Sequence, residues 1–441
     1  MRDSEPSPTD RRALRSRRTI LGTIASIGGV ALAGCMSGGE SGGGMTTTTT
    51  EDGGMTTTEG TMTTTEDGSV DTNPDVAILN YALTLEHLEN AFYRDGLDEF
   101  ADDELMQADA LSKFSETLRM QVPEYLKATG EHEAAHVSAI ADTIEQLGGT
   151  PVEEAEYNFG YETPTEFLAV GKALENTGVA AYAGAAPSIV NNDVLTAALG
   201  IHSVEARHAS FLNLVNSSDP FPKAVDEAKS MDEVIEIASQ FITENPNDSS
   251  ALSRGDSMAT PMRKEDDGTS DVDILNYALT LEHLEAVFYR EGLETFSADE
   301  LRSASVLSDY DAELRMTVPD RLAAIGEHEA AHVTAIADTI EKLGGTPVEE
   351  ATYDFGYETP SEFLAVGKAL ENTGVAAYAG AAPSVSNDDV FAAAAGIHSV
   401  EARHASFLNE LNVANPFPAA VDQPKGMEEV VEIAGQFIVA E

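Results

Sequence analysis

The sequence predicts an all-α protein in which two tandem four-helix bundles follow a disordered N-terminal tether. Three observations support this fold class. Apolar residues recur at helical spacing from residue 75 onward, and strand signals are few. Residues 78–242 align with residues 274–438 at a constant offset of 196, without insertion or deletion. Before residue 75, a Thr-, Gly- and Ser-rich stretch lacks the apolar residues that form a core.

These observations divide the chain into five segments. We expect a signal peptide at residues 1–34, a Thr/Gly/Ser-rich tether at 35–74, a first bundle domain at 75–243, a polar linker at 244–270 and a second bundle domain at 271–441. The two copies are so similar that a residue present in both adds little support for a role. Support for a site must therefore come from the residues of one half.

The chain is strongly acidic. It has 25 Lys and Arg against 77 Asp and Glu, a formal net charge of -52, and without residues 1–34 it keeps 19 basic and 74 acidic residues. A surface this negative repels phosphate backbones and anionic headgroups, which excludes nucleic-acid binding and electrostatic attachment to a membrane. The acids are spread along the whole chain, which favours a halophilic origin over a dedicated cation-capture surface.

The N-terminus carries an export pattern. A basic region at Arg11–Arg18 precedes an apolar run at Thr19–Ala33 that is too short to span a bilayer. Ser16–Leu21 resembles the twin-arginine export signature, a route that carries folded proteins, and Leu32–Cys35 resembles a lipoprotein cleavage site. A buried N-terminal helix is the alternative, but three glycines interrupt the apolar run and disfavour it.

Cys35 is the only cysteine in the sequence, which excludes a disulfide within the chain and a metal site built of thiolates. Lipidation of Cys35 would anchor the protein to the outer face of the cytoplasmic membrane. The tether would then hold the bundles off the surface, with up to about 3.3 Å of reach per extended residue. We expect contact with the membrane through this anchor only.

Within each half the apolar periodicity predicts four long helices and a short one. Breaks are expected in the second helical region near Pro123 and Gly130, because proline removes a backbone donor and glycine disfavours helix. The stretch Gly148–Thr163 is too long for a hairpin turn and predicts a crossover connection. The helical segments predicted in the first half are Ile78–Leu97, Glu104–Leu147, Pro164–Pro187, Asn192–Asn216 and the short amphipathic Met231–Thr243.

Each long helix places one glutamate on its apolar face, and a histidine follows two of these glutamates by one helical turn. In the first half these residues are Glu86, Glu133, His136, Glu175, Glu205 and His208. A buried carboxylate costs several kcal/mol unless it is paired, protonated or bound to a metal, and no Lys or Arg shares these faces. Two divalent cations, bridged by carboxylates and each capped by an imidazole, would supply the missing charge.

The order Glu, Glu-x-x-His, Glu, Glu-x-x-His resembles the site of the ferritin-like superfamily, in which bacterioferritins and rubrerythrins share it. The resemblance covers residues 78–216 and 274–412 and implies two iron or manganese ions per bundle. The implied ligands are the six residues above and their counterparts Glu282, Glu329, His332, Glu371, Glu401 and His404. It also implies catalytic roles for the tyrosines seven residues after the first and third glutamates, which are Tyr93, Tyr182, Tyr289 and Tyr378.

Two features depart from the family pattern. The segment before the second helix is long, and the chain has no rubredoxin-like cysteine module, which excludes a built-in thiolate electron donor. Glu89 rivals Glu86 as a ligand, and we favour Glu86 for its spacing to the tyrosine. Three histidines are expected beside the ligands or on the surface, and two arginines are expected to pair with outer acids: His87, His132, His202, Arg207 and Arg403.

The expected function is that of an exported, lipid-anchored di-metal protein that oxidises Fe(II) or reduces O2 or peroxide. Sites rich in oxygen and nitrogen with open positions favour iron or manganese over structural zinc. A storage shell is disfavoured because a tethered tandem chain is hard to close into a large symmetric assembly, whereas pairing of the two bundles or a homo-oligomer is compatible with the sequence. Two alternatives are a non-enzymatic surface module that binds a partner through the same fold, and a manganese catalase.

Overall fold

The computed structural model describes residues 73–244 and 270–439. The predicted signal peptide, Cys35, the tether up to residue 72 and nearly all of the linker lie outside the described residues. Within them the prediction of two tandem all-α bundles is confirmed. We refer to residues 73–244 as the first half and to residues 270–439 as the second half.

The helices of the two halves correspond one to one. Those of the first half are α2 (Pro74–Glu99), α3 (Asp102–Met106), α4 (Glu116–Gln146), α5 (Pro164–Ala185), α6 (Asn192–Val215) and α7 (Met231–Ala238). Those of the second half are α9 (Asp271–Thr295), α10 (Ala298–Arg302), α11 (Ala312–Lys342), α12 (Pro360–Ala381), α13 (Asp388–Leu411) and α14 (Met427–Ala434). Single 3-10 turns follow α3, α5, α10 and α12.

Local sequence signals begin the long helices. The Asn73 side chain caps α2 by accepting a 3.0 Å hydrogen bond from the Asp75 backbone N–H, and Thr163 caps α5 in the same way through Glu166. A proline occupies the first turn of both helices, where its missing N–H costs nothing. These caps fix the residue at which each helix begins.

Helix α4 corrects one prediction, because it runs unbroken through both Pro123 and Gly130. The interruption lies earlier, between α3 and α4. Pro123 loses one backbone hydrogen bond, but its neighbours Val122 and Leu126 are buried in the core and stabilise the helix. Gly130 does not break the helix. It allows α4 to pack closely on α2, since a Cβ at this position would lie 3.0 Å from the Cβ of Tyr93.

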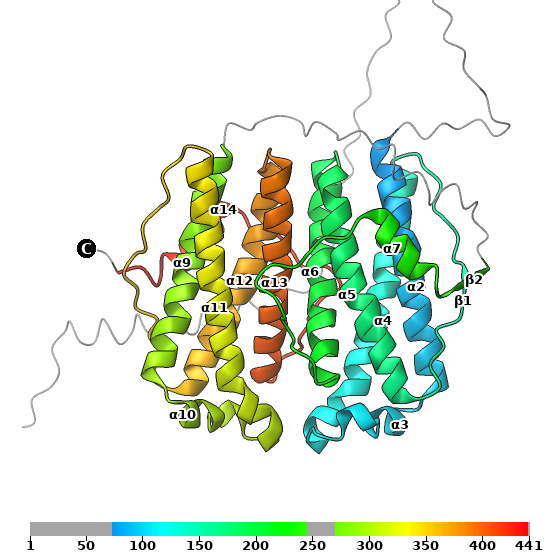
Figure 1. The fold of residues 1–441 in the computed structure, drawn as a ribbon, viewed down its shortest axis with the longest axis horizontal. Coiled ribbons are helices and arrows are strands. Elements are labelled where there is room, and N and C mark those ends of the chain that lie inside the picture. Colours follow the sequence, from blue (N-terminus) through cyan, green and yellow to red (C-terminus); the bar gives the residue numbers. More distant parts are fainter. Residues whose placement is uncertain (1–72, 245–269, 440–441) are drawn as a thin grey trace, which may run out of the picture. The chain divides into compact units, whose positions relative to one another are not determined.

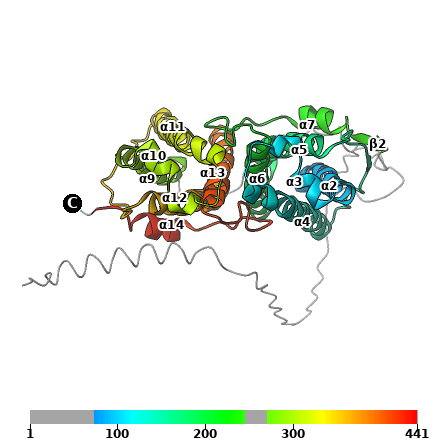
Figure 2. The same cartoon turned by 90° about the horizontal axis from the view of Figure 1, so that it is seen from below.

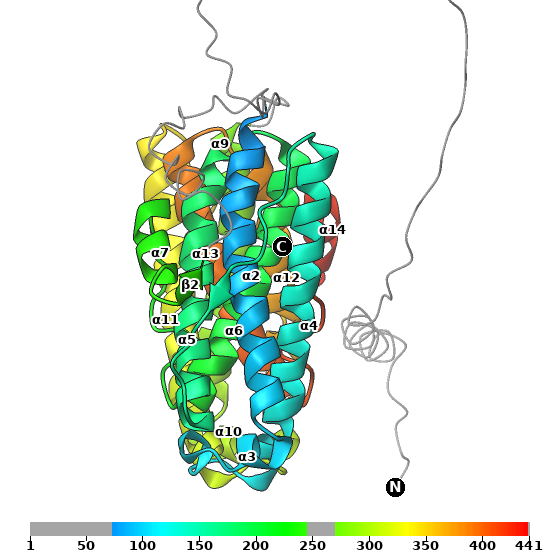
Figure 3. The ribbon, with the colours of Figure 1, turned by 90° about the vertical axis from the view of Figure 1, so that its right-hand side faces the viewer.

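In each bundle two helix pairs close around one core. Helix α2 packs against α4, and α5 packs against α6 (Figure 3). The connection from α4 to α5 is the predicted crossover, and it carries β1 (Glu156–Tyr157), which pairs antiparallel with β2 (Ile242–Glu244). The short helix α7 therefore ends five residues before the predicted Thr243, because the chain turns there into β2. Among the described residues no helix has both the length and the apolar character needed to cross a bilayer.

The two halves pack together through α6 and α13, which lie side by side (Figure 1, Figure 2). The Ser210 hydroxyl donates a 3.0 Å hydrogen bond to the carbonyl of Arg403 on the opposite helix, and Ser406 does the same toward Arg207. Every residue of α6 from Ala198 to Val215 is buried. Small apolar side chains form the centre of this contact: Val179, Ala206, Ala209, Val375, Ala402 and Ala405.

Candidate metal centre

The four long helices of the first half bring six acidic and imidazole side chains into the bundle core. These are Glu86 on α2, Glu133 and His136 on α4, Glu175 on α5, and Glu205 and His208 on α6. They form two groups of four, and within each group the ligand atoms lie within 4.8 Å of one another. Both groups contain Glu133 and Glu205, and each has its own histidine. Two shared carboxylates with one imidazole on either side can hold two cations next to each other. We call this set centre 1.

The imidazole Nδ1 atoms point into centre 1. Nδ1 of His136 lies 3.1 Å from a carboxylate oxygen of Glu86 and 3.2 Å from one of Glu133. Nδ1 of His208 lies 3.1 Å from Glu133 and 3.2 Å from Glu175. All six side chains are 0% exposed, and neither oxygen of Glu205 has a donor in hydrogen-bonding geometry. Centre 1 thus holds unsatisfied, water-excluded acceptors of the kind that a cation satisfies.

The second half repeats this arrangement, and we call the set centre 2. Its members are Glu282, Glu329, His332, Glu371, Glu401 and His404. The distances from the two Nδ1 atoms to the surrounding carboxylates lie between 2.9 and 3.3 Å. All six side chains are again 0% exposed. Every predicted ligand in both halves therefore lies in one of the two centres.

Burial and mutual repulsion decide the protonation of centre 1. Burial raises the pKa of Glu86 to about 7, although His136 acts against it, and burial with Glu133 and Glu175 nearby holds the pKa of Glu205 well above its usual range. Burial also opposes ionisation of Glu133, but the two histidines outweigh it and leave its pKa below the ordinary value. Burial would lower the pKa of His208, but Glu175 and Glu133 raise it to about 9. Protons thus balance charge in a cation-free centre, and bound cations would release them.

The matches to known proteins agree with this geometry. A ferritin-like domain family matches residues 74–217 and, a second time, residues 270–413. The chain belongs to this family. Both matched ranges contain the helices that supply one complete centre. No curated protein matches the chain.

Two tyrosines border each ferritin-like centre. The Tyr93 hydroxyl on α2 donates a hydrogen bond to Glu175 on α5, and the Tyr182 hydroxyl on α5 donates one to Glu86 on α2. Each tyrosine therefore donates to the glutamate on the other helix, and not to the glutamate that lies seven residues before it on its own helix. Burial, with the nearby carboxylates, raises the pKa of both hydroxyls well above the usual range, so both remain donors.

The outer ring nitrogens of the two histidines have different partners. Nε2 of His208 lies 3.0 Å from Nδ1 of His132, whose pKa burial lowers to about 3, so the neutral His132 accepts the hydrogen bond. Nε2 of His136 lies 2.6 Å from the backbone carbonyl of Ala420, which belongs to the second half. Both contacts leave Nδ1 as the nitrogen that faces the centre. His132 is thus beside the ligands, as predicted, whereas no sequence signal points to Ala420.

The remaining predicted neighbours lie around centre 1. Glu89 is only 3% exposed, and a Cβ at Gly178 would lie 3.1 Å from its carboxylate and 2.8 Å from that of Glu205. Glu89 is therefore buried beside the centre, next to Glu205, but it belongs to neither group of four. His87 contacts the carbonyl of Val152 at the bundle surface.

The predicted ion pairs of the arginines exist, but they are buried and join the two halves. Arg207 donates to Asp422 at 2.7 Å, and Arg403 donates to Asp226 at 2.7 Å. His202 is also buried in this contact, where its ring lies 5.6 Å from that of His398. The sequence indicated pairing but not the partner half.

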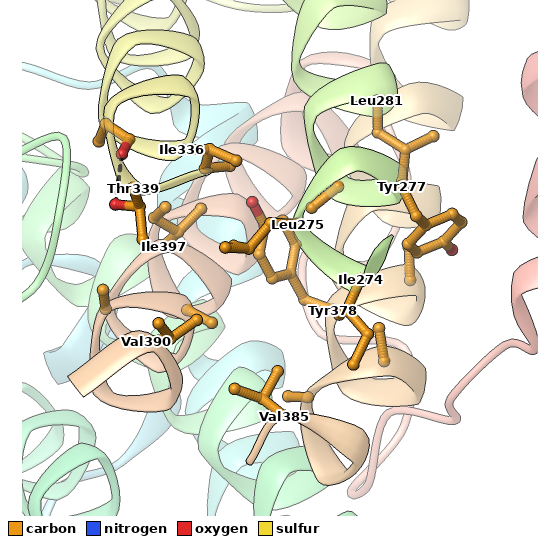
Figure 4. Close-up of a pocket in the computed structure, with 17 residues that line it drawn as sticks. Ile274, Leu275, Tyr277, Leu281, Ile336, Thr339, Tyr378, Val385, Val390 and Ile397 are labelled. Carbon is orange, nitrogen blue, oxygen red and sulfur yellow. Dashed lines mark hydrogen bonds between the residues drawn. The ribbon is translucent and has the colours of Figure 1, made fainter. Parts of the chain in front are cut away.

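An apolar pocket adjoins each centre. In the second half it has a volume of about 70 Å³ and receives side chains from all four long helices, among them Leu275, Ile336, Tyr378 and Ile397 (Figure 4). The equivalent pocket of the first half has a volume of about 60 Å³. Tyr378 links pocket and centre, because its hydroxyl donates a hydrogen bond to Glu282.

Proposed function

We propose that this chain is an exported, lipid-anchored ferritin-like protein that binds two iron or manganese ions in each half and uses O2 or peroxide to oxidise Fe(II). The sharing of Glu133 and Glu205 between two groups of buried ligands carries this proposal. A single structural cation would need only one such group, whereas two groups with common carboxylates suit a pair of redox-active ions.

The ions would supply Lewis acidity and one-electron redox chemistry. The chain would hold them through the carboxylates and the Nδ1 atoms, with Glu133 and Glu205 placed between the two positions. Tyr93 and Tyr182 keep their protons and orient Glu175 and Glu86 through hydrogen bonds. Because all six ligands are fully buried, bulk water is excluded and every electrostatic interaction in the centre is strengthened.

The oxidation balances without a further reductant. Two Fe(II) substrates give up one electron each; O2 takes both electrons and two protons and leaves as H2O2, whereas peroxide takes them and leaves as two waters. The apolar pockets beside Tyr182 and Tyr378 favour O2 as the oxidant, because a small apolar gas partitions into such a pocket more readily than a hydrated ion.

Metal analysis of the full mature chain tests this function. We expect about four ions per chain, two per bundle, and about two after Glu133→Ala or Glu329→Ala alone. The matched control is Glu131→Ala, an exposed position on the same helix, which should keep four. Fe(II) mixed with O2 or peroxide should form ferric absorbance faster with the wild type than without protein, and the Glu133→Ala, Glu329→Ala double variant should lose this acceleration.

Two other results would indicate a different function. A wild type that purifies without metal and refuses added iron and manganese in high salt would favour a non-enzymatic binding module. Tightly bound manganese together with O2 release from peroxide would indicate a catalase.

The export part of the proposal rests on Arg17, Arg18 and Cys35 in the sequence. Replacing both arginines by lysine should hold the protein in the cytoplasm, and Cys35→Ser should leave it unlipidated in a membrane-partition assay. Surface exposure of the double-lysine variant at wild-type level would contradict the twin-arginine route.

A further inference from the structure

Two loops cross between the halves. Residues 216–230 follow α6 and lead to α7, and residues 412–426 follow α13 and lead to α14. We call them exchange segments 1 and 2. In Figure 1 exchange segment 1, in green, passes over α13 before it returns to the first half, and Figure 2 shows both segments on opposite sides of the α6 and α13 pair. Each segment ends back on its own half, where Lys229 donates a backbone hydrogen bond to Ala180, and Lys425 to Ala376.

Exchange segment 2 touches both histidines of centre 1. The carbonyl of Ala420 lies 2.6 Å from Nε2 of His136. The ring of Phe417 lies 4.8 Å from that of His208 in an edge-on contact, and it also packs against His132. The first half thus supplies all six ligands of centre 1, and the second half covers the outer sides of the two imidazoles of that centre.

A buried ion pair fixes exchange segment 2 in this position. Asp422 accepts a 2.7 Å hydrogen bond from Arg207 on α6, and its own backbone N–H donates to the carbonyl of Gly200. Arg207 is only 2% exposed. A Cβ at Gly200 would lie 2.6 Å from the carbonyl oxygen of Asp422, so the glycine permits the close approach. Breaking a buried pair of this kind leaves an uncompensated charge.

Exchange segment 1 makes the same contacts on centre 2. The carbonyl of Ala224 lies 2.5 Å from Nε2 of His332, and the ring of Phe221 lies 5.0 Å from that of His404. Asp226 accepts a 2.7 Å hydrogen bond from Arg403. The same crossed contact is therefore present at both centres.

We propose that each exchange segment positions the histidine ligands of the opposite half's centre, so that each bundle supplies its own six ligands but depends on the other half to orient its two histidines. This inference rests on the proposed di-metal function. The Ala420 carbonyl can only accept, so it keeps the proton of His136 on Nε2 and leaves Nδ1 for the cation. Phe417 excludes water from the His208 side. Ala420 acts through His136 and Asp422 acts through the segment, which makes them positioning residues.

Each exchange segment contacts the centre of the opposite half. Variants in the two segments can therefore separate a positioning role from a general loss of stability. In a Glu329→Ala background only centre 1 binds metal, and Mn²⁺ titration in high salt reports on it. Asp422→Asn should weaken this binding about tenfold to 100-fold, as losses next to a metal ligand usually do. Asp226→Asn, the matched control, should leave it within about twofold of its parent. In a Glu133→Ala background, where centre 2 remains, Asp226→Asn should weaken Mn²⁺ binding and Asp422→Asn should leave it nearly unchanged.

A second readout needs no metal and also separates this proposal from the proposed function. In the metal-free full chain, ¹⁵N NMR of labelled histidine should show a protected Nε2–H of His136 that Asp422→Asn loses and Asp226→Asn keeps. Equal effects of both variants on either centre, or a stronger effect on the variant's own half, would overturn the crossed assignment. A parent chain that binds no Mn²⁺ but shows the crossed NMR effect would defeat the metal function and leave the positioning intact.

Discussion

At the scale of single residues, the two halves differ most clearly at a buried carboxyl group. Glu410 on α13 is 1% exposed, whereas the equivalent residue of the first half is Leu214. The Tyr310 hydroxyl donates to both the backbone and the side-chain oxygen of Glu410, and the first half has Phe114 in its place. The second half therefore contains a titratable group that the first half does without.

Glu410→Leu should stabilise the protein in a pH-dependent manner. Burial raises the pKa of Glu410 from an ordinary 4.5 to about 7. The protonated carboxyl suits the core, so its contribution to stability is complete below pH 4.5 and is lost as the pH rises through 7. At about 1.4 kcal/mol per pKa unit, the variant should gain on the order of 3 kcal/mol more at pH 8 than at pH 4.5.

Urea unfolding of both proteins at the two pH values, in high salt, measures this difference. Glu131→Leu, at an exposed position, should show none. An equal gain of the Glu410→Leu variant at both pH values would mean that Glu410 does not titrate in this window.

At the scale of helices, the sequence predicted the long helices and the buried faces on which the glutamates and histidines of the two centres lie. Periodicity suffices here, because an apolar face must point into the core and the glutamates lie on that face. The prediction failed at Pro123 and Gly130, where intrinsic propensity suggested a break but burial of Val122 and contact with Tyr93 decide the outcome. Propensity is a weak prior against tertiary packing.

The contacts between elements were beyond prediction from one sequence. Spacing related Tyr93 to Glu86 on its own helix, but its hydroxyl binds Glu175 on α5. The ion pair of Arg207 was expected, but not that Asp422 of the other half is its partner. So close a repeat cannot reveal which copy a loop covers, because both copies offer the same contact residues to it. Only the fold distinguishes the crossed arrangement from a local one.

At the scale of the whole molecule, net charge opposes the packing of the two halves. The chain carries 77 acidic residues against 25 basic ones, and the arginines that join the halves are paired in the core, where salt screens little. The repulsion must therefore come from the exposed acids. We propose that the protein is adapted to concentrated salt, which screens these charges.

The metal-free mature chain should then lose helical structure in dilute buffer and regain it in molar salt. The screening length grows from about 3 Å at 1 M to about 30 Å at 0.01 M. Acidic side chains on the two halves are therefore screened from one another at high salt but repel one another at low salt. Circular dichroism during stepwise dilution and return measures the transition. Added Mn²⁺ should shift it to lower salt, because a ligand of the folded state stabilises that state, and the Glu133→Ala, Glu329→Ala variant should not respond. Full helicity of the metal-free chain at about 0.01 M salt would contradict the adaptation, since repulsion at that screening length would then be too weak to matter.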